Sequence, residues 1–311
     1  MAAEGPVLIT GAAGFAGSHL AELLAPAAPL VCWSREIPPP DLVPSVQWQQ
    51  IDLLDREHVR AAVGALRPAR IYHLAGVPHV GGSWEATAPT LAGNVLATHH
   101  LFDALRRAGV RARVLVTASA TVYAPSEGPI AEDGALAPGS PYALSKLAQE
   151  MLTRRAPVED GLDVVIVRAF NHTGPRQAPA FAAPSFARQI ARIERGEQAP
   201  VIRAGNLAPR RDLSDVRDVV RAYAALMQRG ASDATYNVGS GVGRSIGDIL
   251  QALVARARVP VTVETDPALL RPNDTAALVG DCTRLRRDTG WTPAIGFEQM
   301  LDDLLEYWRT Q

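Results

Sequence analysis

Two ionisable side chains stand four residues apart in the segment SPYALSKLAQE, at Tyr142 and Lys146. A helix that begins near Pro141 would place both on one face, about one turn apart. An ammonium near a phenol favours the phenolate, so we expect the pKa of Tyr142, ordinarily about 10, to fall towards neutrality. Tyr142 could then act as a general acid or base. Taken alone, this spacing is common on amphipathic helices and is usually structural.

A second candidate lies in TASATVY, residues 117–123, which follows the apolar run RARVLV. Alone, this stretch is typical of a polar strand end. Together with Tyr142 it gains a chemical meaning, because Ser119 at the carboxyl end of a strand can hydrogen-bond a reacting carbonyl while the phenol donates a proton. We therefore predict Ser119, Tyr142 and Lys146 as catalytic residues.

The elements that position these residues follow an α/β pattern. Short apolar runs alternate with longer helical patterns through the first 170 residues, which predicts βαβ units and a doubly wound, Rossmann-type parallel sheet with ligands beyond the strand carboxyl ends. After RAFNHTGP the strands become shorter, and Pro and Gly become more frequent. We expect a dinucleotide-binding domain in residues 1–170, joined by part of 214–240, and a smaller C-terminal α/β substrate lobe in residues 171–311.

A glycine-rich turn lies between the first expected strand and helix, in VLITGAAGFAGSHL. Gly11, Gly14 and Gly17 permit a tight turn and let backbone N–H groups at the helix N-terminus approach a pyrophosphate. Such a turn alone is often only structural. Its place at the first strand-to-helix junction of an alternating pattern predicts dinucleotide binding.

The end of the second strand bears on the cofactor, since a carboxylate there favours NAD and small or basic residues favour NADP. The strand ends in VCWSRE, so Ser34 and Arg35 favour NADPH, whereas Glu36 keeps NAD open as the alternative. Asp52, after the third strand, either accepts a hydrogen bond from the adenine amino group or caps the following helix.

Taken together, the three glycines, HLAG at 73–76, Asn94, Ser119 and the Tyr142/Lys146 pair resemble the extended short-chain dehydrogenase/reductase family, specifically its nucleotide-sugar epimerases, dehydratases and reductases. The resemblance covers nearly the whole chain. It implies that Tyr142 is the acid/base, that Lys146 binds the nicotinamide ribose and that Ser119 polarises the substrate oxygen. Further implied cofactor contacts are Phe15, Ala16, Leu53, Leu74, Ala75 and Gly76.

The resemblance continues in the C-terminal half, where family members hold a nucleoside diphosphate sugar. Guanidinium groups bind phosphate oxygens bidentately, and Arg211 and Arg271 fall where the family places its diphosphate arginines. Asn171 falls where a family residue contacts the same group. Alternatively, Arg211 pairs with a neighbouring aspartate. Arg188, in SFARQIARIE, either reaches the nucleotide or is solvated.

Within this family, GNL followed by RDLSDVRD and RPND looks most like the GDP-mannose branch, and FNHTGP and YNVGSG favour its 4-keto reductases. Family dehydratases need a carboxylate two residues after the catalytic Ser or Thr, and this position is Thr121. Pro78 lies where galactose-type 4-epimerases tend to carry a lysine. We therefore expect NADPH-dependent reduction of a GDP-4-keto-6-deoxymannose. The alternatives are an NAD-dependent NDP-sugar 4-epimerase and, less favoured, a catalytically silent dinucleotide-binding regulator.

The composition of the chain bears on whether it binds nucleic acid, a membrane or a metal. Of 311 residues, 47% are apolar and 20% charged, and the formal net charge of −1 gives no reason to expect nucleic-acid binding. No apolar run reaches the roughly 20 residues of a membrane span, so we expect a cytosolic protein. Cys32 and Cys282 lack metal-ligand spacing and are predicted to be inert, with no metal site. The resemblance implies a homodimer formed through the helices near residues 90–108 and 142–155.

Overall fold

The computed structural model describes residues 5–27, 29–38, 42–78, 81–270 and 275–311. Its main sheet has seven strands in the order β10-β6-β5-β4-β1-β2-β3, and all neighbouring pairs are parallel. The doubly wound α/β fold predicted from the sequence is thereby confirmed. The strands are β1 (Val7–Thr10), β2 (Leu30–Ser34), β3 (Gln47–Gln50), β4 (Arg70–His73), β5 (Arg113–Thr117), β6 (Asp163–Ala169) and β10 (Ala234–Val238).

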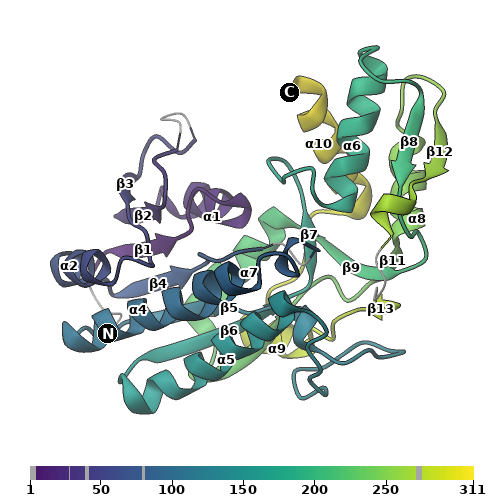
Figure 1. The fold of residues 1–311 in the computed structure, drawn as a ribbon. Helices are drawn as coiled ribbons and strands as arrows, with labels where there is room; N and C mark the ends of the chain where they lie inside the picture. Colours follow the sequence, from purple (N-terminus) through teal and green to yellow (C-terminus); the bar gives the residue numbers. More distant parts are fainter. Residues whose placement is uncertain (1–4, 28, 39–41, 79–80, 271–274) are drawn as a thin grey trace.

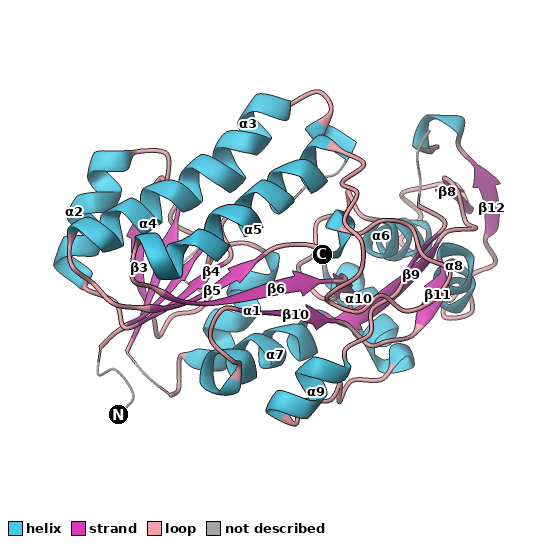
Figure 2. Ribbon diagram, turned by 90° about the horizontal axis from the view of Figure 1, so that it is seen from below, coloured by secondary structure: helices cyan, strands magenta, loops and turns pink. Residues whose placement is uncertain are grey.

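Helices cover both faces of this sheet, as Figure 2 shows. One face carries α1 (Phe15–Leu24), α7 (Val216–Arg229) and α9 (Thr283–Thr289). The other face carries α2 (Arg56–Leu66), α4 (Ala97–Arg107) and α5 (Pro141–Glu159), with α3 (Thr87–Leu91) running into α4 through a π-helical turn, η2 (Ala92–Leu96). Strands such as β1, β5 and β6 therefore have apolar residues on both faces, because helices cover both faces of the sheet.

Alternating side chains along each strand contribute to two different hydrophobic cores, one on each face of the sheet. Ile9 of β1 lies in the core with α1 and α7, and its neighbour Leu8 lies in the core with α2, α4 and α5. Successive side chains of a strand point to opposite faces, so this division follows from the extended backbone. Both residues are fully buried.

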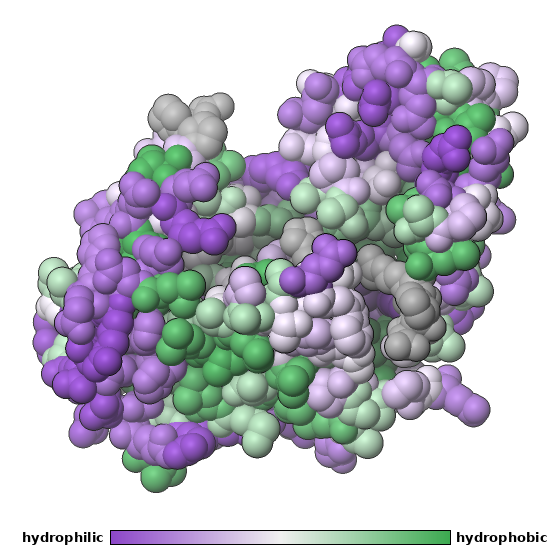
Figure 3. Space-filling model, viewed as in Figure 1, coloured by the Kyte–Doolittle hydropathy of each residue, from purple (hydrophilic) through white to green (hydrophobic). Residues whose placement is uncertain are grey.

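The C-terminal lobe has its own core and stands upright beside the sheet in Figure 1. Its strands are β7 (Asn171–Thr173), β8 (Val201–Ala204), β9 (Arg210–Asp215), β11 (Gly243–Ser245), β12 (Thr262–Thr265) and β13 (Ala277–Leu278). Its helices are α6 (Ala182–Glu194), α8 (Ile246–Val254) and α10 (Phe297–Thr310). Across the described residues, short 3-10 turns form η1 (Gly81–Ser83), η3 (Ala120–Val122) and η4 (Pro267–Leu269). Between the lobe and the sheet the surface is hollowed (Figure 3).

The chain crosses between the main sheet and the C-terminal lobe more than once. It enters the C-terminal lobe at β7, which pairs with β9, and returns through α7 to place β10 beside β6 at the edge of the main sheet. Asp215 ends β9 and caps α7 by accepting a hydrogen bond from Arg217 N at 2.8 Å. The crossing places the residues of β7 and β9 near the carboxyl end of β6, where ligands of such sheets bind.

Candidate active site

The glycine-rich turn joins β1 to α1 with no room for a side chain at Gly11 or Gly17. Gly11 has a φ of +70°, and a Cβ there would lie 2.7 Å from the Cα of Ala75 at the end of β4. A Cβ on Gly17 would collide with the carbonyl of Gly11. Glycine is needed at both positions, since the backbone is tightly packed and Gly11 adopts a left-handed conformation. The backbone N–H groups at the start of α1 are thus accessible to a phosphate.

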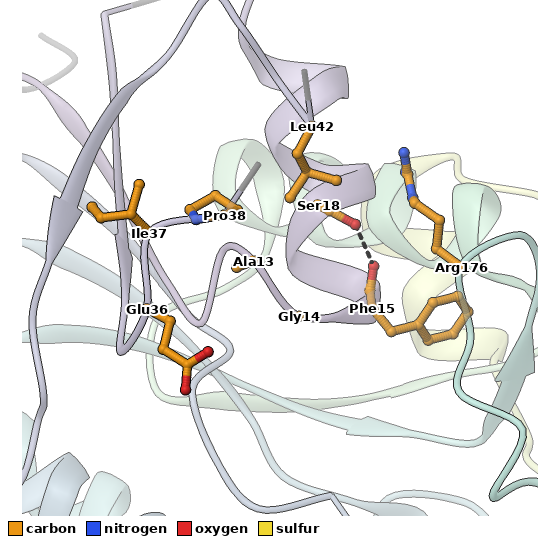
Figure 4. A pocket seen from close by; sticks show the side chains of 9 residues that line it. All are labelled: Ala13, Gly14, Phe15, Ser18, Glu36, Ile37, Pro38, Leu42 and Arg176. Carbon is orange, nitrogen blue, oxygen red and sulfur yellow. Dashed lines mark hydrogen bonds between the residues drawn. The ribbon is translucent and has the colours of Figure 1, made fainter. Parts of the chain in front are cut away.

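A pocket of about 350 Å³ opens beside this turn (Figure 4). It is lined by Ala13, Gly14, Phe15, Ser18, Glu36, Ile37, Pro38, Leu42 and Arg176. The turn, the end of β2 and the loop after β7 thus meet at one cavity. Its mixed polar and apolar lining fits a nucleotide, and its floor is the start of α1, where anions bind.

The end of β2 contributes to the same place. Ser34 is buried, and its hydroxyl donates to the backbone carbonyl of Glu36, whereas Arg35 is exposed. Glu36 itself lines the pocket. The two cofactor signals of the sequence are therefore both present: a basic residue at the strand end and a carboxylate beside the turn.

Asp52 does not cap α2, which was one of the two roles that the sequence left open for it. Asp55 caps α2, and its side chain accepts a hydrogen bond from His58 N at 3.0 Å. Asp52 is exposed and accepts from Leu54 N at 2.9 Å, a local turn. Leu53 beside it is buried. The adenine-binding role remains a prediction for Asp52.

Helix α5, which carries Tyr142 and Lys146, begins at Pro141, as expected from the sequence. The Ser140 hydroxyl caps it by accepting from Ala143 N at 3.1 Å, and the Ser83 hydroxyl accepts from Tyr142 N at 3.2 Å. Ser83 lies in η1, after β4, and is buried. The start of α5 is therefore fixed by two hydroxyls, one of which comes from a distant loop.

Ser119 and Tyr142 meet at the carboxyl end of β5. Burial raises the pKa of Tyr142, and a hydrogen bond from the Ser119 hydroxyl, which favours the phenolate, offsets only part of this rise. The Ser119 hydroxyl also lies 2.9 Å from that of Thr121, and Thr121 N donates to it at 3.2 Å. Two hydroxyls and one phenol thus gather at one point, so a carbonyl oxygen there would find hydrogen-bond donors.

The expected lowering of the Tyr142 pKa by Lys146 is wrong for this structure. Lys146 is 5% exposed, and its Nζ donates to Thr117 O at 2.9 Å and to the amide oxygen of Gln149 at 3.0 Å. The ammonium is held by these oxygens, and burial dominates the pKa of the phenol. Burial also lowers the pKa of Lys146 to about 8. The phenol of Tyr142 is therefore protonated at neutral pH.

Arg211, a candidate substrate-binding residue, lies on β9, next to β7. In the parallel pairing Asn171 stands opposite Leu213, so Asn171 and Arg211 lie on adjacent strands, two residues out of register. An Nη1 of Arg211 donates to Thr275 O at 2.7 Å. The neighbouring Asp212 accepts from the backbone of the 240–241 loop, so its carboxylate organises a turn.

The other two substrate candidates are less informative. Arg188, on α6, is exposed, and its guanidinium lies 5.8 Å from the ring centroid of Trp308 on α10. No described contact brings it to Ser119, Tyr142 or Arg211. Arg271 lies outside the described residues.

Several residues around the site have no strong sequence signal. Gln149 contacts Lys146 and could have been suspected from its spacing on the same helix face. Ser83 and Arg176 reach the site only through tertiary structure, and Arg176 adopts a φ of +73° that its residue type does not predict.

Comparison with known proteins places this geometry in a family. The model of the GDP-mannose 4,6-dehydratase family matches residues 8–304. The chain belongs to this family. Its resemblance to the extended short-chain dehydrogenases/reductases is thereby confirmed.

Members of the GDP-mannose 4,6-dehydratase family and its neighbours align along the whole chain. GDP-6-deoxy-D-mannose reductase of Pseudomonas aeruginosa is 35% identical over 308 residues, covering 98% of this chain and 97% of the relative. The solved structure of RMD from the same organism, complexed with NADPH, has a TM-score of 0.86 at 34% identity and covers 98% and 99% of the two chains. UDP-glucose 4-epimerase of Thermus thermophilus, in complex with NAD, has a TM-score of 0.87 at 29% identity, with the same coverage.

Proposed function

We propose that this family member is an NADPH-dependent oxidoreductase that reduces the C4 ketone of GDP-4-keto-6-deoxy-D-mannose. The product is a GDP-6-deoxyhexose, either GDP-rhamnose or GDP-6-deoxytalose. The observation that carries the proposal is the placement of the Ser119 hydroxyl by the buried Tyr142 phenol at the carboxyl end of β5, with the Thr121 hydroxyl 2.9 Å from that of Ser119. The similarity to the P. aeruginosa reductase supports the same reaction.

The glycine-rich turn between β1 and α1 fits a dinucleotide. Ala13 and Gly14 are exposed at the start of α1. A Cβ on Gly76 would lie 2.5 Å from Asn94 Oδ1 and 3.4 Å from Lys146 Nζ, so the absence of a side chain lets this backbone lie close to both residues. When bound, NADPH supplies the hydride. Phe15, Ala16, Leu74 and Ala75 would hold it through their backbone, with Arg35 and Ser34 at the adenosine end.

The position of Tyr142 makes its phenol the candidate proton donor. Its phenol is neutral at pH 7, because burial raises the pKa, so it can donate to an oxyanion that forms at the substrate C4 oxygen. Ser119 would donate a hydrogen bond to the same oxygen and hold it in place. Thr121 lacks the basicity that removal of a substrate proton requires, so reduction is favoured over 4,6-dehydration.

The diphosphate end relies on β7 and β9. Arg211 and Asn171 would bind the diphosphate from adjacent strands, with Arg271 and Arg188 as further candidates. The main sheet and the C-terminal lobe have separate hydrophobic cores, which supports the expected division into a dinucleotide-binding part and a sugar-binding lobe. No helix among the described residues is long and apolar enough to cross a membrane, and the cytosolic location stays a prediction.

Cofactor choice can be tested at the end of β2. We expect Arg35→Ala to weaken NADPH binding about tenfold and to leave NADH binding unchanged, because a charge-assisted hydrogen bond to the 2′-phosphate is lost. Glu36→Gln is the matched opposite, since it removes a carboxylate that repels this phosphate and can bind a ribose hydroxyl. Fluorescence titration of both variants with both nucleotides checks the prediction. A parallel loss of NADH and NADPH binding in Arg35→Ala would contradict it.

The principal alternative is an NAD-dependent NDP-sugar 4-epimerase. It is favoured by Glu36 in the pocket and by the similarity to the T. thermophilus epimerase that binds NAD. The absorbance of NADPH, followed with the enzymatically prepared keto sugar, distinguishes the two. The reductase consumes NADPH with each turnover. An epimerase would retain NAD on purification and need no added cofactor.

Nucleotide recognition can be tested without catalysis. A ligand that binds only the folded state raises the melting temperature. We expect GDP to protect the protein more strongly than UDP, CDP or dTDP at equal concentration. Equal protection by all four would remove the support for a GDP-sugar.

A homodimer is also part of the proposal. Apolar side chains gather over α4 and α5 on the face shown in Figure 3. Leu96 at the end of η2 and Leu144 and Met151 on α5 are exposed. A contiguous exposed apolar patch of this kind is typical of an interface.

We expect Leu144→Glu combined with Met151→Glu to convert a dimer into a monomer, because the charges would be desolvated at the contact. Size-exclusion chromatography with light scattering checks this. Leu23→Glu, on the opposite face of the sheet, is the control and should leave the mass unchanged. A wild-type protein that elutes as a monomer would refute the dimer.

A further inference from the structure

The ammonium of Lys146 is anchored by a buried glutamine on its own helix. Gln149 is fully buried, and its Oε1 accepts from Lys146 Nζ at 3.0 Å. Thr117 O, at the end of β5, accepts a second hydrogen bond at 2.9 Å. An ammonium has three N–H donors, so these two contacts leave one for a ligand.

The amide of Gln149 is itself oriented by a buried chain of hydrogen bonds. Its Nε2 donates to Thr98 Oγ1 at 2.8 Å, and this hydroxyl donates to Asn94 O at 2.7 Å. Since the single hydroxyl proton of Thr98 is used, its oxygen can only accept from the amide. The oxygen of Gln149 therefore faces Lys146, and the alternative amide orientation would set two donors against each other.

The chain continues to the first strand of the sheet. His73 Nε2 lies 2.8 Å from Thr98 Oγ1, and its Nδ1 lies 2.8 Å from Thr10 Oγ1. Because Thr98 can only accept, the network assigns the ring proton to Nε2 and makes Nδ1 an acceptor. Burial, together with the charge of Lys146, lowers the pKa of His73 to about 3, so the ring stays neutral. The lysine is thus braced against β1 and β4 through neutral groups.

We infer that Gln149 is a positioning residue of the active site, whose amide oxygen holds the Lys146 ammonium with one N–H donor available to the nicotinamide ribose. The inference rests on the proposed function, in which Lys146 binds this ribose. Gly76 is exposed, and a Cβ there would lie 3.4 Å from Lys146 Nζ, so the ammonium lies beside solvent-accessible backbone on this side. Gln149 touches neither substrate nor cofactor and acts only through the lysine.

The surroundings of the ammonium make its charge sensitive to Gln149. The titratable group whose pKa responds to its charge is His73 on β4, and Tyr142 lies one turn earlier on α5. The other elements contribute neutral groups, the carbonyl of Thr117 on β5 and the side chain of Asn94 on η2. Burial already lowers the pKa of Lys146 to about 8. Loss of an acceptor would lower it further, and an added carboxylate would raise it.

The test compares Gln149→Met with Gln149→Glu. The dissociation constant of NADPH is measured by fluorescence as a function of pH, because binding weakens when Lys146 loses its charge. In Gln149→Met we expect about tenfold weaker binding at neutral pH and an alkaline limit about one pH unit lower than in the wild type. In Gln149→Glu the limit should move about one pH unit upward. The turnover rate of the wild type and both variants is measured over the same range.

The matched control is Gln189→Met on α6. Gln189 makes two hydrogen bonds with the backbone of Arg203, so its loss should lower the melting temperature without moving the pH limit. Opposite shifts in the two Gln149 variants support the inference, and Gln149→Glu alone decides if Gln149→Met fails to fold. Unshifted limits in the folded variants would overturn it. Because NADPH binding needs no sugar, a wild type inactive on the keto sugar would refute the proposed reaction without refuting the role of Gln149.

Discussion

Tyr142→Phe is expected to lower turnover of the keto sugar by roughly 10²–10⁴-fold while NADPH still binds. The variant removes only the phenolic oxygen, which supplies the proton to the C4 oxygen and accepts the hydrogen bond from Ser119. Steady-state rates with saturating NADPH, together with NADPH titration of the same preparation, check this. The two readouts separate a lost proton donor from a disturbed cofactor site.

The control for this prediction is Tyr307→Phe on α10, whose ring packs edge-on against Trp308 in the C-terminal lobe. It should retain the wild-type rate. Substantial turnover in Tyr142→Phe would show that another group donates the proton. Since burial raises the pKa of Tyr142, we also expect the reduction rate of the wild type to fall on the alkaline side and not near neutrality.

The largest loss of stability is expected for Glu150→Ala, at about 3–5 kcal/mol in the free energy of unfolding. Glu150 is fully buried on α5, and its two oxygens accept from Arg168 of β6 at 2.9 and 2.6 Å. Arg154 donates to the same carboxylate at 2.7 Å. Alanine would leave the buried Arg168 without this partner. Urea denaturation followed by circular dichroism measures the effect.

The control is Glu159→Ala on the same helix, where an exposed pair with Arg155 should contribute less than about 1 kcal/mol. Equal losses in the two variants would contradict the role of the buried pair. Burial acts to raise the pKa of Glu150, but the hydrogen bonds and charges of the two arginines hold it below its ordinary value. A carboxylate with a depressed pKa stabilises the fold fully above its unfolded-state pKa of about 4.3, and this contribution is lost as the pH falls through the folded-state pKa.

The features that the sequence predicts best are those carried by local patterns. Alternating apolar and helical segments predict the parallel sheet, and the turn at Gly11 and Gly17 is predicted by its place after the first strand. The start of α5 is predicted by Pro141, which favours the first turn of a helix. In each of these cases the pattern that reveals the feature lies within a short stretch of sequence, even where distant contacts complete the structure.

The features that the sequence does not predict depend on tertiary contacts. The pKa of Tyr142 is set by burial, and the ammonium expected to lower it is held instead by Thr117 and Gln149. The capping of α2 falls to Asp55 and not to Asp52, although both are acidic and three residues apart. Two nearby residues of one type are not distinguished by pattern alone, because backbone geometry decides which one accepts the hydrogen bond.

The most direct measurement of the central claim uses NADPH that carries deuterium at the transferable position of the nicotinamide. The labelled cofactor is incubated with GDP-4-keto-6-deoxy-D-mannose, and the product is analysed by mass spectrometry and NMR. We predict one deuterium at C4 of the hexose and one NADP⁺ formed for each product molecule. A sugar converted without label and without net oxidation of NADPH would contradict the account and indicate an epimerase.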